Sequence, residues 1–129
     1  MAKREKLALA RLSISEAEAV RTFVKSANER YPQMIARVVL FGSKARGEGQ
    51  VESDIDVLVI VRREDWHLSN AISTLAARVS LEQGVLLGPI VIGQERWERM
   101  EREKFSLVRN VARDGIALEE GGFVAKAGW

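Results

Sequence analysis

The sequence contains no cysteine among its 129 residues, so disulfide bonds, thiolate catalysis and cysteine-ligated zinc sites are excluded. Long apolar runs are missing as well, because no stretch approaches the roughly 20 apolar residues of a membrane-spanning helix. The apolar residues near the N-terminus are interrupted at Arg11, too early for a secretory signal. We therefore expect a cytoplasmic protein that does not cross a membrane.

The chain also has little excess charge of either sign. It contains 20 Lys and Arg against 18 Asp and Glu, which gives a formal net charge of +2. A nucleic-acid-binding protein usually concentrates basic residues along one face or stripe, and this sequence has no such block. Direct binding of nucleic acid is therefore not expected.

What the sequence does contain is enough apolar material for one hydrophobic core. The apolar fraction is 47%, and a chain of this length buries roughly two-thirds of its unfolded surface. We expect a single domain, residues 1–129, in which residues 1–14 and 119–129 are loose termini.

The pattern of apolar and turn residues predicts alternating helices and strands. The first helix begins with a capping box formed by Ser15 and Glu18, and the second has an Asp65 cap and ends at Gly84. A Gly-Pro dipeptide in the middle of the third strand indicates a bulge or an edge position. These signals predict an α/β (α+β) fold, a small mixed sheet of three or more strands with helices packed on one side. Helices are expected over residues 16–30, 66–83, 94–105 and 106–115, and strands over residues 35–41, 55–61 and 85–92.

The segment after the first strand has the features of an anion-binding turn. Gly42 can adopt backbone angles closed to other residues, and Ser43 offers a hydroxyl and the N-cap of a short helix. Backbone N–H groups at such a helix start bind phosphate. For Lys44 and Arg46, a phosphate contact and a solvated charge are equally expected. Two common phosphate-binding motifs, G-x-x-x-x-G-K-[ST] and G-x-G-x-x-G, are absent.

Two carboxylates stand at the start of the second strand. Side chains two residues apart on a strand point to the same face, so Asp54 and Asp56 face the same way. Such a pair is repulsive unless a cation lies between the two groups, and Mg²⁺ accepts one or two carboxylates together with phosphate oxygens. The alternative is a turn-and-cap pair before a strand. A phosphate-binding turn beside a divalent-metal site indicates nucleotidyl or phosphoryl transfer.

These residues form a known signature. Gly42 and Ser43, ten further residues, and then Asp54-x-Asp56 match the pattern G-S-x10-D-x-D. The stretch FGSKARGEGQVESDIDVLV resembles the minimal nucleotidyltransferases of the DNA polymerase β-like superfamily, and the resemblance covers roughly residues 20–118. It implies the polymerase β-like nucleotidyltransferase fold. It also implies that Gly42, Ser43 and Arg46 bind the triphosphate of ATP and that the catalytic Asp54 and Asp56 bind Mg²⁺.

The resemblance further implies a reaction and a partner. Minimal members of this family commonly act as antitoxins beside a HEPN-domain ribonuclease toxin. The implied reaction is the transfer of AMP from ATP to a tyrosine hydroxyl of that toxin. A chain of this size has little room for a domain that binds a small acceptor such as an aminoglycoside, so a protein acceptor is favoured. An oligomer is compatible with the sequence.

One departure from the family pattern concerns the third strand. Catalytic members supply a third carboxylate from a later strand, but the segment VLLGPIVI contains no acid, and Gly88 stands at about that place. Glu82 lies just before this strand and Glu95 just after it, so neither has the strand position that the third carboxylate takes in the family. The alternative function is therefore a weak or inactive nucleotidyltransferase-like antitoxin that acts as a binding module. The single histidine, His67, is expected to be a partly exposed packing residue rather than a catalytic base.

Overall fold

The computed structural model describes residues 12–42, 54–119 and 122–126. The strands predicted over residues 35–41 and 55–61 are confirmed, as are the helix cap at Asp65 and the left-handed Gly84 at that helix's end. Within the described ranges, no helix is long and apolar enough to cross a membrane. The elements are α2 Ile14–Arg30, β1 Ile35–Phe41, β2 Ile55–Val61, α4 Trp66–Gln83, β3 Leu87–Gly93, α5 Gln94–Arg102, α6 Ser106–Asp114, β4 Ile116–Glu119 and β5 Gly122–Lys126.

The strands form one mixed sheet in the order β3-β2-β1-β4-β5. β1 is antiparallel to β2 and β4, β4 is antiparallel to β5, and β2 is parallel to β3. The register between β2 and β3 runs without a shift through Pro89, so the Gly-Pro dipeptide marks an edge strand and not a bulge. The sequence analysis did not predict β4 and β5, and β5 lies in the segment that was expected to be loose.

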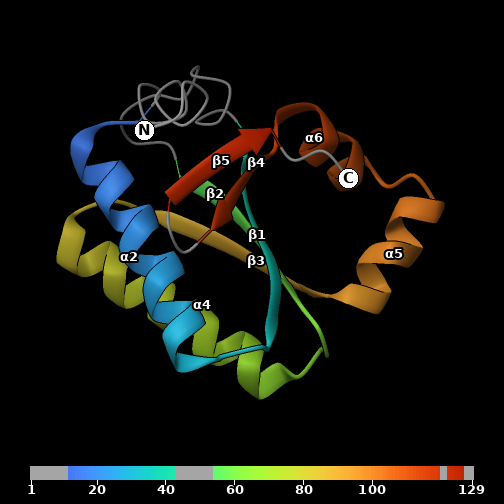
Figure 1. Ribbon diagram of the computed structural model, residues 1–129, viewed down its shortest axis with the longest axis horizontal. Coiled ribbons are helices and arrows are strands. Elements are labelled where there is room, and N and C mark those ends of the chain that lie inside the picture. The colour runs from blue at the N-terminus through green and yellow to red at the C-terminus, as the bar shows by residue number, and fades with distance from the viewer. Residues whose placement is uncertain (1–11, 43–53, 120–121, 127–129) are drawn as a thin grey trace.

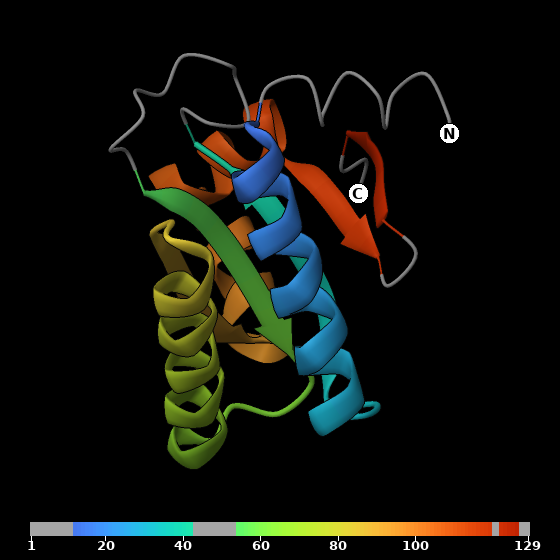
Figure 2. The same ribbon diagram turned by 90° about the vertical axis from the view of Figure 1, so that its left-hand side faces the viewer.

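Helices cover both faces of the sheet, which corrects the expectation that they pack on one side. α2 and α4 lie on one face and α5 and α6 on the other (Figure 1). Turned by 90°, the molecule shows α2 and α4 in front of β2 (Figure 2). The reason is the apolar run of β2: Val57 and Val59 enter the core under α2 and α4, whereas Leu58 and Ile60 enter the core under α5 and α6.

The start of α2 also differs from the prediction. The capping box is formed by Ser13 and Glu16, in which the Glu16 N–H donates to Ser13 Oγ at 3.1 Å and the Ser13 N–H donates to Glu16 Oε1 at 2.8 Å. The sequence offers a second Ser-x-x-Glu set two residues later, at Ser15 and Glu18. Both sets satisfy the same local rule, so the local sequence could not decide between them.

Glu64 ties together the C-terminal ends of the parallel strands β2 and β3. Its Oε1 accepts a hydrogen bond from the Gly93 N–H at 2.6 Å and another from Arg96 Nε at 2.9 Å. A Cβ atom at Gly93 would lie 2.7 Å from the Cβ of Glu64, so this approach requires glycine. The hydrogen bond from Gly93, and then the Arg96 guanidinium, lower the pKa of Glu64.

This lowered pKa predicts a pH-dependent contribution to stability. A carboxylate with a lowered folded-state pKa stabilises the protein above its ordinary pKa of 4.5, and the contribution is lost as the pH falls through the folded-state value. Glu64→Gln keeps an acceptor for Gly93 but removes the charge. Because solvent screens a side chain this exposed, we expect a loss of about 0.5–1 kcal/mol at neutral pH. Urea unfolding across the acid range checks this; a difference between the two proteins that does not shrink in acid would contradict it.

Candidate active site

The two carboxylates lie at the N-terminal end of β2, on the face of the sheet that α5 and α6 cover. Asp54 directly precedes the strand and is exposed. Asp56 is the second residue of the strand and is half-buried. On the neighbouring strand, Gly88 stands opposite Asp56 in the parallel register. A Cβ atom at Gly88 would lie 3.5 Å from Asp54 Oδ2 and 3.8 Å from Asp56 Oδ1. The structure therefore brings both acids together beside an open position on β3.

The closeness of the two acids affects the pKa of Asp56. Burial raises the pKa of Asp56, and the negative charge of Asp54 raises it further. The charge of Asp54 thus opposes ionisation of Asp56, and a cation beside the two groups would favour the ionised form of Asp56. Two carboxylates on one face supply hard oxygen ligands of the kind that suit Mg²⁺. The residues present therefore fit the metal that the sequence analysis assigned to them.

Gly42 lies directly against this pair. Phe41, the last residue of β1, pairs with Asp56, so the next residue passes beside the carboxylate. Gly42 has a φ of +81°, and a Cβ atom there would overlap Asp56 Oδ2. The prediction that Gly42 adopts backbone angles closed to other residues is confirmed. Its contact with Asp56 was not predicted, because strand pairing is not visible in the sequence.

Other residues of the predicted site cannot be placed in the same way. Ser43, Lys44 and Arg46 lie outside the described residues, so a phosphate-binding role for this turn stays a prediction. His67 is exposed and its ring contacts that of Trp66, with the centroids 3.7 Å apart. It follows the opposite end of β2, and so it is not part of this site.

No third acid joins the pair in the part of the chain that the structure describes. Among the described residues, the three atoms nearest to a Cβ atom at Gly88 all belong to Asp54 and Asp56. Glu95 instead lines a cavity with Arg62 and Arg63 at the far end of β2. Among the described residues, no group of three or more His, Cys, Asp or Glu side chains is placed to hold a metal ion. The described site is thus a two-carboxylate site.

Similarity to known proteins shows the family of this chain. Residues 20–115 match the family model described as "Nucleotidyltransferase domain". A protein of Methanocaldococcus jannaschii named as a candidate protein adenylyltransferase is 32% identical over 105 residues, which cover 81% of this chain and 99% of that protein. A second protein of that organism, with the same name, is 36% identical over 75 residues, covering 57% of this chain and 76% of its own length.

A solved structure supports the fold. A protein of Sulfolobus solfataricus, described as a candidate nucleotidyltransferase, superposes with a TM-score of 0.50 over 96% of each chain at 20% identity. The chain therefore belongs to the nucleotidyltransferase domain family and is a nucleotidyltransferase.

Proposed function

We propose that this protein transfers AMP from ATP to a hydroxyl group of a partner protein. The observation that carries the proposal is the carboxylate pair, Asp54 and Asp56, held on one face of β2 against Gly42. The names of the two relatives support a protein acceptor. The resemblance to minimal antitoxin nucleotidyltransferases supports a tyrosine of a HEPN-domain ribonuclease toxin as that acceptor, and hence an antitoxin role.

The proposed reaction is a displacement at the α-phosphorus of ATP. The acceptor oxygen forms a bond to this phosphorus, the bond to the bridging oxygen breaks, and pyrophosphate leaves. The hydroxyl proton passes to water or to a base of the acceptor protein, because β3 has no carboxylate at Gly88. Asp54 and Asp56 hold Mg²⁺, which supplies charge neutralisation for the phosphate oxygens. Gly42 keeps the backbone close to Asp56 and so orients this carboxylate.

Labelled ATP tests this function. The protein is incubated with Mg²⁺, ATP labelled at the α-phosphate and a purified HEPN-domain protein. We expect label on the HEPN-domain protein, at a tyrosine identified by mass spectrometry, and no label from ATP labelled at the γ-phosphate. Tight complex formation without any label would reject transfer and favour the alternative, a non-catalytic binding module.

The alternative is favoured by the absence of an acid in β3, and Gly88 offers a direct test of it. A Cβ atom at Gly88 meets the carboxylates only at ordinary contact distances, so a side chain fits there. Gly88→Asp would place a third carboxylate beside Asp54 and Asp56. General-base assistance of this kind contributes about 10²–10⁴-fold, so we expect AMP transfer to rise at least about tenfold.

Gly88→Asn is the matched control, because it has the same shape without the charge. Initial rates of AMP transfer are compared for the two variants and the wild type. If Gly88→Asp is no faster than Gly88→Asn, a missing carboxylate does not limit this site.

A further inference from the structure

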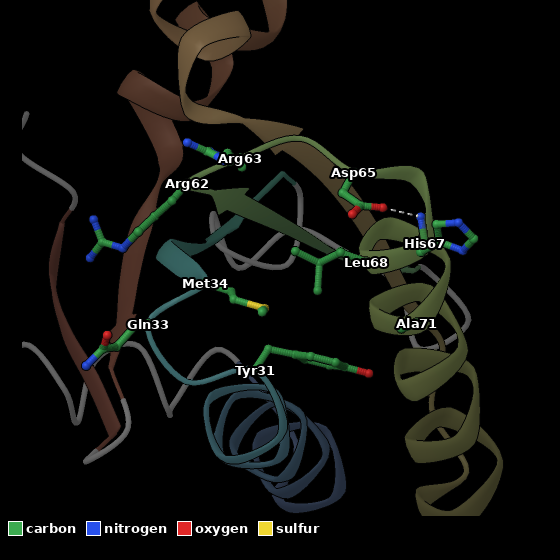
Figure 3. A pocket seen from close by; sticks show the side chains of 9 residues that line it. All are labelled: Tyr31, Gln33, Met34, Arg62, Arg63, Asp65, His67, Leu68 and Ala71. Carbon is green, nitrogen blue, oxygen red and sulfur yellow. Dashed lines mark hydrogen bonds between the residues drawn. The ribbon is translucent and has the colours of Figure 1, made fainter.

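A second concave region lies at the opposite end of β2 from the carboxylates. Arg62 and Arg63 follow the last residue of this strand, roughly 20 Å from Asp56 at about 3.3 Å per residue. A cavity of about 660 Å³ opens there between the end of α2 and the start of α4 (Figure 3). A second cavity, of about 320 Å³, shares the same two arginines and is also lined by Glu64 and Arg96.

The larger cavity has an apolar wall with arginines at its border. Tyr31, Met34, Leu68 and Ala71 line it, and Figure 3 shows Met34 and Leu68 between Tyr31 and the end of β2. Arg62 projects from the strand end on the side away from α4. The wall is accessible, since Met34 is 50% exposed. The cavity can therefore accept an apolar side chain of a ligand, while charged groups next to that side chain lie near the arginines at the end of β2.

Backbone hydrogen bonds hold this surface in shape. The Met34 N–H donates to the Tyr31 carbonyl at 3.1 Å, and the Arg62 N–H donates to the Met34 carbonyl at 2.9 Å. Gln33, which lies between Tyr31 and Met34 in the chain, adopts a φ of +63°, which is uncommon for a residue other than glycine. The turn between α2 and β1 is thus tied to the end of β2. A surface formed in advance binds a partner with a smaller entropic cost.

The charges of this surface are unbalanced. The guanidinium groups of Arg62 and Arg63 make no hydrogen bond or ion pair with another described residue, and both side chains are exposed. Two of the nearby acids are engaged elsewhere: Glu64 pairs with Arg96, and Asp65 Oδ1 accepts the His67 N–H at 2.8 Å to cap α4. The third, Glu95, lines the smaller cavity and forms no ion pair with either arginine. Two free cations therefore border an apolar wall.

The composition of the surface indicates a protein partner. Tyr, Trp, Met and Arg are enriched at protein–protein interfaces. Tyr31, Met34, Arg62 and Arg63 line the cavity, and Trp66, which is 67% exposed, contacts the ring of the lining residue His67. A single-stranded nucleic acid would need a basic track that continues past open stacking faces. Here the two arginines border a wall that includes the aliphatic Met34, Leu68 and Ala71.

We propose that this surface docks an acidic segment of a partner protein. An apolar side chain of that segment occupies the cavity between Tyr31, Met34 and Leu68, and neighbouring carboxylates bind Arg62 and Arg63. Guanidinium groups bind carboxylates through two parallel hydrogen bonds, which makes arginine well suited to this recognition. The surface lies far from Asp54 and Asp56, so the docking does not depend on whether AMP is transferred.

The test begins with selection from a random peptide library displayed on phage, with the full-length protein as bait. We expect selected peptides in which Leu or Phe adjoins Asp or Glu. The dissociation constant of the best peptide is then measured by fluorescence anisotropy. Removing two exposed ion pairs, in the double variant Arg62→Ala with Arg63→Ala, is expected to weaken binding about tenfold. Met34→Ala is expected to weaken it about fivefold through lost apolar burial.

Two exposed residues outside both cavities provide matched controls. Arg78→Ala removes an arginine from the surface of α4, and Leu81→Ala removes an apolar side chain that is 86% exposed. Both should bind the peptide as the wild type does, and circular dichroism checks that every variant is folded.

Several results would overturn the proposal. One is a selection that yields no peptide, or peptides without acidic residues. Another is a dissociation constant that the double arginine variant leaves unchanged, or that Arg78→Ala raises equally. Tighter binding of labelled oligouridylate than of the selected peptide, lost in the same arginine variant, would assign the surface to nucleic acid instead.

Discussion

Asp56→Asn is expected to lower AMP transfer by about a thousandfold, which corresponds to about 4 kcal/mol of transition-state stabilisation. The reason is that, in the proposed reaction, the half-buried Asp56 and the exposed Asp54 together supply the hard oxygens for Mg²⁺ at the start of β2. Asparagine keeps the shape of the side chain but supplies a neutral oxygen, so the site loses half of its charge. Asp54→Asn should have a similar effect for the same reason.

The same substitution should not destabilise the metal-free protein. The pKa of Asp56 is raised from its ordinary 3.8, by burial and by Asp54. A group with a raised folded-state pKa stabilises the fold below its unfolded pKa and loses this contribution as the pH rises through the folded value. At neutral pH the ionised Asp56 therefore costs stability, and asparagine removes the cost. We expect a Tm at least as high as that of the wild type without metal, and a rise in Tm on adding MgCl₂ only in the wild type.

Initial rates of AMP transfer and thermal melts with and without MgCl₂ check both expectations. Glu95→Gln is the matched control, because Glu95 lines the cavity at the far end of β2 and should leave the rate unchanged. The assignment fails if Asp56→Asn keeps more than about a tenth of the wild-type rate, or if Glu95→Gln lowers the rate equally.

Gly42→Ala is expected to lower both stability and transfer. Its φ of +81° disfavours any residue with a Cβ atom, at a cost of about 1 kcal/mol. The added atom would also overlap Asp56 Oδ2 and lie 3.2 Å from Asp56 Cγ. The Asp56 carboxylate must therefore move away from residue 42 and leave its present position. We expect the free energy of unfolding to fall by about 2 kcal/mol in total and AMP transfer to fall about a hundredfold.

Gly84→Ala separates the two effects. Gly84 also has a left-handed conformation, with a φ of +69°, but a Cβ atom there would meet nothing within 4 Å. This control should lose about 1 kcal/mol of stability in urea unfolding and keep the wild-type rate of transfer. If Gly42→Ala transfers AMP as fast as Gly84→Ala, the contact between Gly42 and Asp56 has no role in catalysis.

Local patterns were sufficient for much of the fold. The bounds of β1 and β2 follow from continuous apolar runs that end at Gly42 and begin after Asp54. α4 follows from its Asp65 cap and its Gly84 end. Each of these signals depends on residues close together in the chain, which is why the sequence alone defines them. The two overlapping capping boxes of α2 show the limit, because Ser13 and Ser15 are locally equivalent.

Long-range pairing decided the rest of the fold. β4 is a strand because its backbone pairs with β1, with Leu118 opposite Val38 and Ile116 opposite Leu40. A segment of only four residues has too weak a local pattern to be predicted. The covering of both faces of β2 likewise depends on where α5 and α6 return to the sheet, far along the chain.

The candidate site divides in the same way. The period of a strand is two residues, so the sequence is enough to place Asp54 and Asp56 on one face. The contact of Gly42 with Asp56 and the position of Gly88 beside both acids depend instead on tertiary structure, because they need β1 and β3 to pair with β2 in one register. The proposed docking surface also depends on tertiary structure, because the hydrogen bond from the Arg62 N–H to the Met34 carbonyl joins residues 28 positions apart in the chain. A sequence records which side chains a strand presents, whereas the free energy of packing and strand pairing decides what they face.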